Sequence, residues 1–227
     1  MSEDLKGKSA CVLGGTSSIG LQTAILLSKN GIKVTAFGRK IPSKTEENQN
    51  IEFVSCNLDS FFDDENSKEN QKILNKIKNC DIFVNCYGPF IQKSIEETTF
   101  EHWKNMALQN YALNGFLISS VIPNMKKNHF GRIVLFGGTR TESVKAYKTT
   151  VAYSGAKTAL SVLVKSAASL YADDGITVNE ILPGFTRNVP ENTKPVTDKM
   201  LAEKVLFLIQ NDELNGTLIN VDRAWNP

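Results

Sequence analysis

The sequence predicts an α/β fold in which helices cover both faces of a doubly wound parallel sheet of about seven strands. Two observations lead to this prediction. Apolar runs of strand length alternate with helical patterns along the whole chain. The runs are continuously apolar, which is typical of parallel strands buried on both faces. No linker or internal repeat interrupts them, so residues 1–227 are expected to form one domain.

The elements are expected in strict alternation. The first strand, 8–13, precedes a helix at 19–29, which has apolar residues at helical spacing and stops at the helix-end signal Asn30-Gly31. The acidic and polar segment 60–70 is expected to be a loop. The remaining strands are expected at 33–37, 51–54, 81–85, 132–136, 177–182 and 217–221, and the remaining helices at 72–78, within 100–127 (one or two), at 151–172 and at 196–210.

Composition excludes several classes of function. The 26 Lys+Arg residues nearly balance the 24 Asp+Glu residues, which argues against nucleic acid or an anionic membrane as the partner. No apolar run approaches the ~18–20 residues of a membrane span, and the polar N-terminus lacks the apolar core of a signal peptide. A cytoplasmic location is therefore expected.

The cysteines and histidines give no metal signature. The four cysteines have no C-x-x-C spacing and are expected to be reduced, half-buried thiols. The two histidines lie far apart, so no metal site is expected. These residues are Cys11, Cys56, Cys80, Cys86, His102 and His129.

Tyr153 and Lys157 lie four residues apart in a predicted helix and therefore share one face. A free tyrosine has a pKa near ~10, and a neighbouring ammonium favours the phenolate and lowers that pKa. Such a pair can give a proton to a carbonyl oxygen or take one from an alcohol. Taken alone, the spacing is a weak signal, because chance matches are common and a solvated helix face explains most of them.

The segment Gly14–Gly20 joins the first strand to the first helix. Gly14 allows a tight turn, the helix N-terminus offers free N–H groups to a pyrophosphate, and Gly20 lets the helix pack closely. The spacing Gly14-x-x-x-Ser18-x-Gly20 differs from the G-x-G-x-x-G of ordinary dinucleotide folds. A purely structural glycine turn is the alternative.

Together these motifs resemble the short-chain dehydrogenase/reductase family, whose first turn reads T-G-x-x-x-G-x-G. Leu13 and Ser18 depart from that pattern. The other matches follow in the family's order over nearly the whole chain: Asn85-Cys-Tyr-Gly88 for N-N-A-G, Asn110, the strand at 131–136, Tyr153 with Lys157, Pro183-Gly184, and 216–222. The resemblance is to members like 3-oxoacyl-carrier-protein reductase and implies a Rossmann-type fold.

The resemblance implies a nicotinamide cofactor, and the residues after the second strand indicate which one. NAD-using relatives tend to place an acid at the position of Gly38. Here Arg39 and Lys40 follow, and Arg39 can pair with a 2′-phosphate, so NADP(H) is expected; two solvated cations are the alternative. Asn57 stands where the family often has an aspartate against the adenine. The other implied cofactor contacts are Gly14, Thr16, Ser17, Ser18, Ile19, Gly20, Leu58, Asn85, Gly88, Tyr153, Lys157, Pro183, Gly184 and Thr186.

The resemblance also implies the reaction, a hydride transfer between the nicotinamide and a small carbonyl or alcohol substrate. Tyr153 would be the general acid/base, and Lys157 would lower its pKa and bind the nicotinamide ribose. Asn110 would hold a water that links Lys157 to solvent; a buried asparagine that satisfies helix backbone is the alternative.

Gly138 stands where the family has its catalytic serine. Loss of one such donor costs on the order of 10²–10³ in rate. Thr139 is the nearest substitute, and Thr141 and Ser143 are others. Dihydropteridine reductases, relatives in this family, also lack the serine, so a dihydropteridine- or quinone-type reductase is an alternative. A catalytically silent dinucleotide sensor or scaffold is a third.

The chain also departs from the family in length. Only residues 185–195 separate the Pro-Gly turn from the next helix, where the family has a longer lid. Relatives commonly pair through the helices that carry Asn110 and Tyr153, so a homodimer or homotetramer is expected. The residues that could make this contact, or lie in the core instead, are Leu160, Leu163, Val164 and Leu170.

Overall fold

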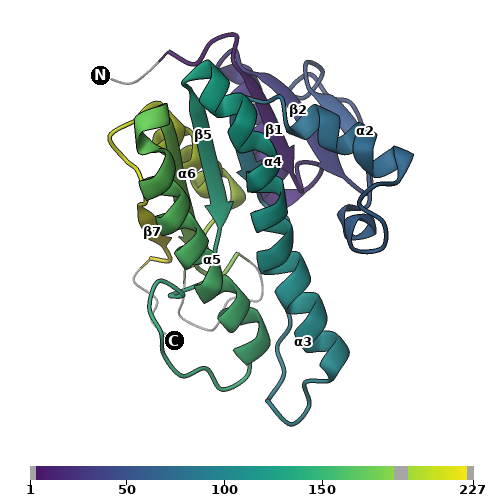
Figure 1. The fold of residues 1–227 in the computed structure, drawn as a ribbon, viewed down its shortest axis with the longest axis vertical. Coiled ribbons are helices and arrows are strands. Elements are labelled where there is room, and N and C mark those ends of the chain that lie inside the picture. Colours follow the sequence, from purple (N-terminus) through teal and green to yellow (C-terminus); the bar gives the residue numbers. More distant parts are fainter. Residues whose placement is uncertain (1–3, 187–193, 224–227) are drawn as a thin grey trace.

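One seven-stranded sheet forms the centre of the molecule, in the order β3-β2-β1-β4-β5-β6-β7 (Figure 1). The computed structural model describes residues 4–186 and 194–223. Every neighbouring pair of strands is parallel, which confirms the predicted sheet. The strands are β1 (Ser9–Leu13), β2 (Lys33–Gly38), β3 (Glu52–Ser55), β4 (Ile82–Asn85), β5 (Gly131–Phe136), β6 (Ile176–Pro183) and β7 (Leu218–Val221).

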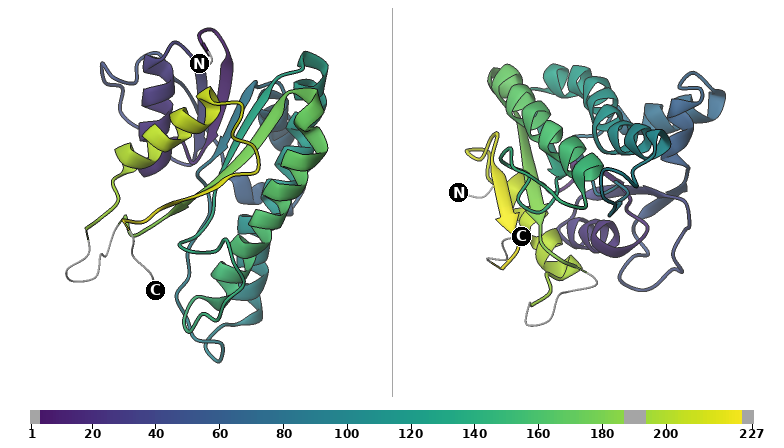
Figure 2. Two further views of the ribbon diagram at one scale, coloured as in Figure 1. Left: turned by 90° about the vertical axis from the view of Figure 1, so that its left-hand side faces the viewer. Right: turned by 90° about the horizontal axis from the view of Figure 1, so that it is seen from below.

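Helices cover both faces of this sheet. On one face lie α1 (Ser18–Lys29) and α6 (Asp198–Gln210), and on the other lie α2 (Lys68–Ile77), α4 (Leu113–Asn128) and α5 (Val151–Tyr171) (Figure 2). The helix α3 (Phe100–Ala107) continues into α4 through a π-helical segment, Leu108–Ala112. Within the described ranges, every helix is too short or too polar to cross a membrane.

The two faces explain why the strands read as continuous apolar runs. In β1, Cys11 and Leu13 pack into the core under α4 and α5, whereas Ala10 and Val12 pack into the core under α1. Successive strand side chains point to opposite faces, so both sets of positions must be apolar.

The loop predicted at 60–70 is wrong in part. A 3₁₀ helix occupies Leu58–Phe62, and α2 begins at Lys68, capped by the Ser67 hydroxyl, which accepts from the Asn70 amide N–H at 3.2 Å. Asn70 itself is buried, and its side chain donates to the carbonyls of Ser60 and Asp64 at 2.9 and 2.7 Å. The polar composition serves an internal hydrogen-bond network, which a hydropathy pattern cannot distinguish from a solvated loop.

The cysteines are free, but the expected half-buried state holds only for Cys86. Cys11, Cys56 and Cys80 are buried. Burial raises the pKa of the Cys56 thiol to about 11, opposed by a backbone hydrogen bond from Gly38. The half-buried expectation was wrong for these three residues because both faces of the sheet are covered.

The first turn depends on a close backbone contact. Gly14 adopts the left-handed region at φ +68°. A Cβ on Gly20 would lie 2.2 Å from the Gly14 carbonyl oxygen and 2.6 Å from its carbon. Because the obstacle is backbone, a side chain at Gly20 would displace the start of α1 from β1.

We therefore expect Gly20→Ala to lower the free energy of unfolding by ~1–3 kcal/mol, measured by urea denaturation. Gly115→Ala is the matched control, because a Cβ there meets nothing within 4 Å. In that helical position, alanine is expected to stabilise the protein by ~0.5–1 kcal/mol. Equal unfolding midpoints for the two variants would contradict the contact.

Candidate functional site

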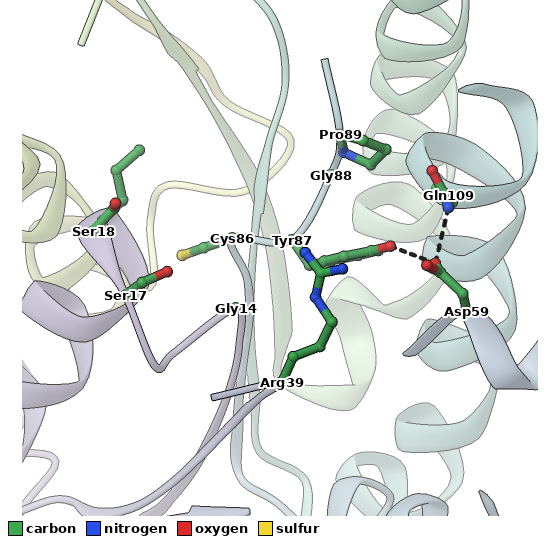
Figure 3. Close-up of a pocket in the computed structure, with 12 residues that line it drawn as sticks. Gly14, Ser17, Ser18, Arg39, Asp59, Cys86, Tyr87, Gly88, Pro89 and Gln109 are labelled. Carbon is green, nitrogen blue, oxygen red and sulfur yellow. Dashed lines mark hydrogen bonds between the residues drawn. The ribbon is translucent and has the colours of Figure 1, made fainter. Parts of the chain in front are cut away.

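A cavity of about 430 Å³ lies at the carboxyl ends of β1 and β4. The chain runs from β1 outward to β3 and then returns to the other side of β1 with β4, so this is the topological switch point where α/β folds bind ligands. Figure 3 shows the first turn facing residues 86–89 across the cavity. Its lining is Gly14, Ser17, Ser18, Ile19, Gly20, Arg39, Asp59, Cys86, Tyr87, Gly88, Pro89 and Gln109.

The first turn keeps its shape despite Ser18. Ser18 has φ +47°, in the left-handed region, where the motif has glycine. A non-glycine residue there costs roughly 1–2 kcal/mol. The hydroxyl of the N-cap residue Ser17 makes no capping hydrogen bond, so the N–H groups of the first turn of α1 are not satisfied by the cap. This end of α1 is suited to an anionic group.

Thr16 explains the glycine at the end of β2. A Cβ on Gly38 would lie 2.1 Å from Thr16 Oγ1 and 2.9 Å from Thr16 Cγ2. An acidic side chain at this position would therefore collide with Thr16. Arg39, the next residue, lines the cavity, whereas the exposed Lys40 is not among its lining residues.

The adenine-side residues expected from the resemblance lie outside the cavity lining. Asn57 caps the 3₁₀ helix, accepting from the Asp59 N–H at 3.3 Å, and Leu58 is buried in the core. Asp59 lines the cavity instead. Any contact from Leu58 to a ligand would have to come from its backbone.

Three side chains that the sequence analysis missed meet across one wall of the cavity (Figure 3). Asp59 accepts hydrogen bonds from the Tyr87 hydroxyl and, at 2.9 Å, from Gln109 Nε2. Burial, followed by the hydrogen bond to Asp59, raises the pKa of Tyr87 above its ordinary range, and the nearby Arg39 opposes this. The available signal was a large polar residue, Tyr87, at the alanine position of N-N-A-G.

Asn85 fixes the loop that carries these residues. Its side-chain amide donates to Asn114 Oδ1 at 2.7 Å, and its side-chain oxygen accepts from the Tyr87 N–H at 2.9 Å. Asn85 is buried, so it acts on the cavity by holding the backbone of residues 86–88.

Tyr153 and Lys157 lie on the same face of α5, as their spacing predicts. The Lys157 ammonium is 5.9 Å from the centre of the Tyr153 ring and donates to the Phe136 carbonyl at 2.6 Å. Phe90 packs edge-on against Tyr153, with ring centres 4.9 Å apart. Lys157 is buried, and its amine reaches the carboxyl end of β5.

Burial is the main influence on the pKa values of Tyr153 and Lys157. It raises the pKa of Tyr153 above the ordinary range, and the negative charge of Glu180 adds to the rise. Burial lowers the pKa of Lys157 to about 8, opposed by Glu180 and Cys86. The lowered tyrosine pKa expected from the sequence is therefore not found, because burial and the negative charge of Glu180 both raise it. Tyr153 is held as the neutral phenol.

Asn110 lies in the π-helical segment, a feature often found at functional sites. It is buried, and its side-chain amide donates to the Pro89 carbonyl at 3.1 Å. Its Oδ1 atom has no hydrogen-bond partner among the described residues. A Cβ on Gly88 would lie 2.6 Å from that oxygen and 3.0 Å from Lys157 Nζ. Gly88 thus lets an unsatisfied acceptor and a buried cation approach the same point.

Gly138 lies beside the phenol. A Cβ placed on it would be 3.0 Å from Tyr153 Cε1 and 3.4 Å from the Tyr153 oxygen. Thr139 donates its hydroxyl to the Pro183 carbonyl at 2.7 Å, and Thr141 donates to the Gly138 carbonyl at 2.9 Å. Both neighbouring hydroxyls are therefore held by backbone carbonyls, and the structure gives Thr139 no hydrogen bond to Tyr153.

The Pro-Gly turn follows β6 at the same edge of the sheet. A Cβ on Gly184 would lie 2.7 Å from the Cα of Asp222, so the end of β7 packs against this turn. Asp222 pairs with Arg140 Nε at 2.6 Å. Thr186 is described, but most of the short segment 185–195 lies outside the described residues.

The fold agrees with the sequence comparison. The family model "short chain dehydrogenase" matches residues 8–200. The chain belongs to the short-chain dehydrogenase family. It is thus an oxidoreductase whose family implies a nicotinamide dinucleotide, NAD or NADP.

Several relatives of this short-chain dehydrogenase are similar over most of their length. It is 30% identical to 2-dehydro-3-deoxy-D-gluconate 5-dehydrogenase of Bacillus subtilis, over 95% of this chain and 87% of that protein. It is 26% identical to D-beta-hydroxybutyrate dehydrogenase of Rhizobium meliloti, over 96% and 98% of the two chains. It is 30% identical to 3-oxoacyl-[acyl-carrier-protein] reductase of Buchnera aphidicola subsp. Schizaphis graminum, over 83% and 78%.

A solved short chain dehydrogenase/reductase family protein has the same fold, with a TM-score of 0.82 at 24% identity, over 97% of this chain and 98% of that one. The cavity suits the cofactor that the family implies, since the left-handed Gly14 and the start of α1 open onto it. Among the described residues, no group of His, Cys, Asp or Glu side chains could hold a metal ion.

Proposed function

We propose that this short-chain dehydrogenase is NADP(H)-dependent and transfers a hydride between the nicotinamide and a small carbonyl or alcohol, with Tyr153 as general acid/base. The observation that carries the proposal is the meeting of the Tyr153 phenol, the Lys157 ammonium and the free Asn110 oxygen around Gly88 and Gly138. These groups lie at the same edge of the sheet as the dinucleotide cavity.

A nicotinamide bound in the cavity would supply or accept the hydride. In the reductive direction, Tyr153 donates a proton to the carbonyl oxygen of the substrate, and its raised pKa keeps the phenol protonated for this role. Lys157 holds a positive charge near the developing phenolate. A water between Lys157 and Asn110 Oδ1 would satisfy that buried acceptor and connect the pair to solvent.

The choice of NADP(H) rests on Arg39 and on the absence of an acid at Gly38. Arg39 lines the cavity and can pair with a 2′-phosphate. Thr16 occupies the space that an acidic side chain at Gly38 would need. The nearby Asp59 is engaged by Tyr87 and Gln109, which offset part of its negative charge.

The substrate class is supported by the relatives and by the surface beside Tyr153. The names of the relatives include a hydroxybutyrate, a 3-oxoacyl group and a sugar acid, and each pairs a carbonyl or hydroxyl with an acyl or acid group. Phe90 packs on Tyr153 and is 61% exposed, which gives the substrate side an apolar contact. A 3-oxoacyl-type compound is the leading candidate.

Gly138 favours a second candidate, a dihydropteridine- or quinone-type reductase, because an activated substrate needs less help from a serine. A silent dinucleotide sensor is the weakest alternative, since a binding protein has no evident need for Tyr153, Lys157 and Asn110 together.

We further propose that residues 1–227 form one domain that assembles as a homodimer or homotetramer. Leu160 and Val164 belong to the core, and Leu163 packs against it. Leu170 is 71% exposed and Val162 63% exposed on α5, so these two remain for a contact between copies.

Tyr153→Phe is expected to reduce NADPH oxidation with a carbonyl substrate by ~10²–10⁴-fold, because the proton donor is lost. The affinity for NADPH, measured by fluorescence titration, should stay within about twofold. Tyr147→Phe is the control, since that phenol donates to the Arg140 carbonyl at 2.9 Å on the neighbouring loop. A Tyr153→Phe enzyme as fast as Tyr147→Phe would exclude the acid/base role.

Gly138→Ser should separate the two substrate classes. Its Cβ must be accommodated beside Tyr153, and Gly138→Ala carries the same steric cost without the hydroxyl. For an unactivated ketone, we expect kcat/KM of the serine variant to exceed that of the alanine variant by at least about tenfold, because the hydroxyl can donate to the substrate oxygen. Equal values on ketones, with turnover of a dihydropterin by the wild type, would favour the pteridine-type reading.

A further inference from the structure

Glu180 is a buried carboxylic acid whose charge acts on both Tyr153 and Lys157. It lies in β6 between β5 and β7, and its side chain is fully buried. Ser161 on α5 donates to Glu180 Oε2 at 2.8 Å, while Oε1 has no hydrogen-bond partner among the described residues. A carboxyl group in such a place is costly, so its presence calls for an electrostatic partner in addition to the hydrogen bond from Ser161.

The free oxygen points to the end of β5. A Cβ on Gly137 would lie 2.2 Å from Glu180 Oε1, so Glu180 fits only because residue 137 has no side chain. The carbonyl that precedes Gly137, that of Phe136, is the one that accepts the Lys157 ammonium at 2.6 Å. Glu180 and Lys157 thus meet the same short stretch of β5.

The charges of Glu180 and Lys157 influence each other. The negative charge of Glu180 raises the pKa of Lys157, against burial, and also raises the pKa of Tyr153. Burial raises the pKa of Glu180 itself to about 7, opposed by the hydrogen bond from Ser161 and by the Lys157 charge. The other titratable groups that act here are Glu142, which raises the pKa of Glu180, and Cys86, which raises that of Lys157.

We propose that Glu180 is a positioning residue whose buried carboxylate keeps Lys157 protonated and Tyr153 in the phenol form, and so sets the pH range in which the pair can donate a proton. The electrostatic part concerns Lys157 in the free protein and needs no substrate. The kinetic part rests on the proposed function. No covalent step is involved, since Glu180 acts only through its charge.

The first test is an NMR titration of the lysine ε-CH₂ groups from pH 6 to 10, with the Lys157 signal identified by its loss in Lys157→Met. The wild-type midpoint should lie near pH 8. In Glu180→Gln, the midpoint should fall by half a unit or more, about a threefold loss in proton affinity. The sign follows from removing an anion that favours the charged amine. An unchanged midpoint in folded Glu180→Gln would overturn the proposal and leave Glu180 as a structural partner of Ser161.

Two further variants serve as a control and as a substitute for Glu180→Gln. Glu142→Gln removes a neighbouring acid that raises the pKa of Glu180, so the Lys157 midpoint should stay or rise slightly. Ser161→Ala serves if Glu180→Gln does not fold. It removes a hydrogen bond that favours the carboxylate, so the Lys157 midpoint should fall, by less than in Glu180→Gln. A midpoint that fell equally in Glu142→Gln and Glu180→Gln would also overturn the proposal.

The second test is the pH profile of kcat/KM for carbonyl reduction. Loss of the Lys157 proton and loss of the Tyr153 proton both end activity at high pH, and removing Glu180 lowers both pKa values. The alkaline limb should therefore move to lower pH in Glu180→Gln, with about threefold less activity than wild type at pH 9 after both are scaled to pH 6.5. An unmoved limb would overturn the kinetic part. If the NMR midpoint shifts while the wild type reduces no carbonyl, the charge coupling stands and the proposed function fails.

Discussion

The burial of Lys157 is the constraint on which the rest of the site depends. A cation that is removed from water must find polar partners or lose its proton. Lys157 is held by the Phe136 carbonyl and feels the charge of Glu180. The free Asn110 oxygen lies nearby, across Gly88. Each of these groups comes from a different element, so the charge of one side chain connects the end of β5, the interior of β6 and the loop after β4 with the π-helical segment.

Glycine makes this arrangement possible at three points. Gly88 leaves room for Lys157 and Asn110, Gly137 leaves room for Glu180, and Gly138 leaves room for Tyr153. All three follow the carboxyl ends of β4 or β5, where the strands end in loops. Gly138 therefore matters sterically as well as through its lack of a hydroxyl, because any side chain at this position would crowd the Tyr153 ring.

The sequence was sufficient for the sheet, for nearly every helix and for the first turn, because burial on two faces imposes a continuous apolar pattern. It was insufficient where polar residues are buried. Asn70 hid the start of α2, and Glu180 gave no signal because nothing local tells a buried acid from an exposed one. The half-buried Asp59 gave none either, and Tyr87 was marked only by its place at the alanine position of N-N-A-G. The pKa of Tyr153 was misjudged for the same reason, since the hydration it loses depends on tertiary packing.

The most direct measurement is a fluorescence titration of the wild-type protein with NADPH and, separately, with NADH, which requires no knowledge of the substrate. We expect NADPH to bind at least tenfold more tightly, a difference of ~1.4 kcal/mol, because Arg39 lines the cavity and no acid stands at Gly38, the last residue of β2. Equal or tighter binding of NADH would contradict the assigned cofactor. Binding of neither would contradict the proposed oxidoreductase activity itself, since Tyr153 and Lys157 would then have no hydride donor beside them.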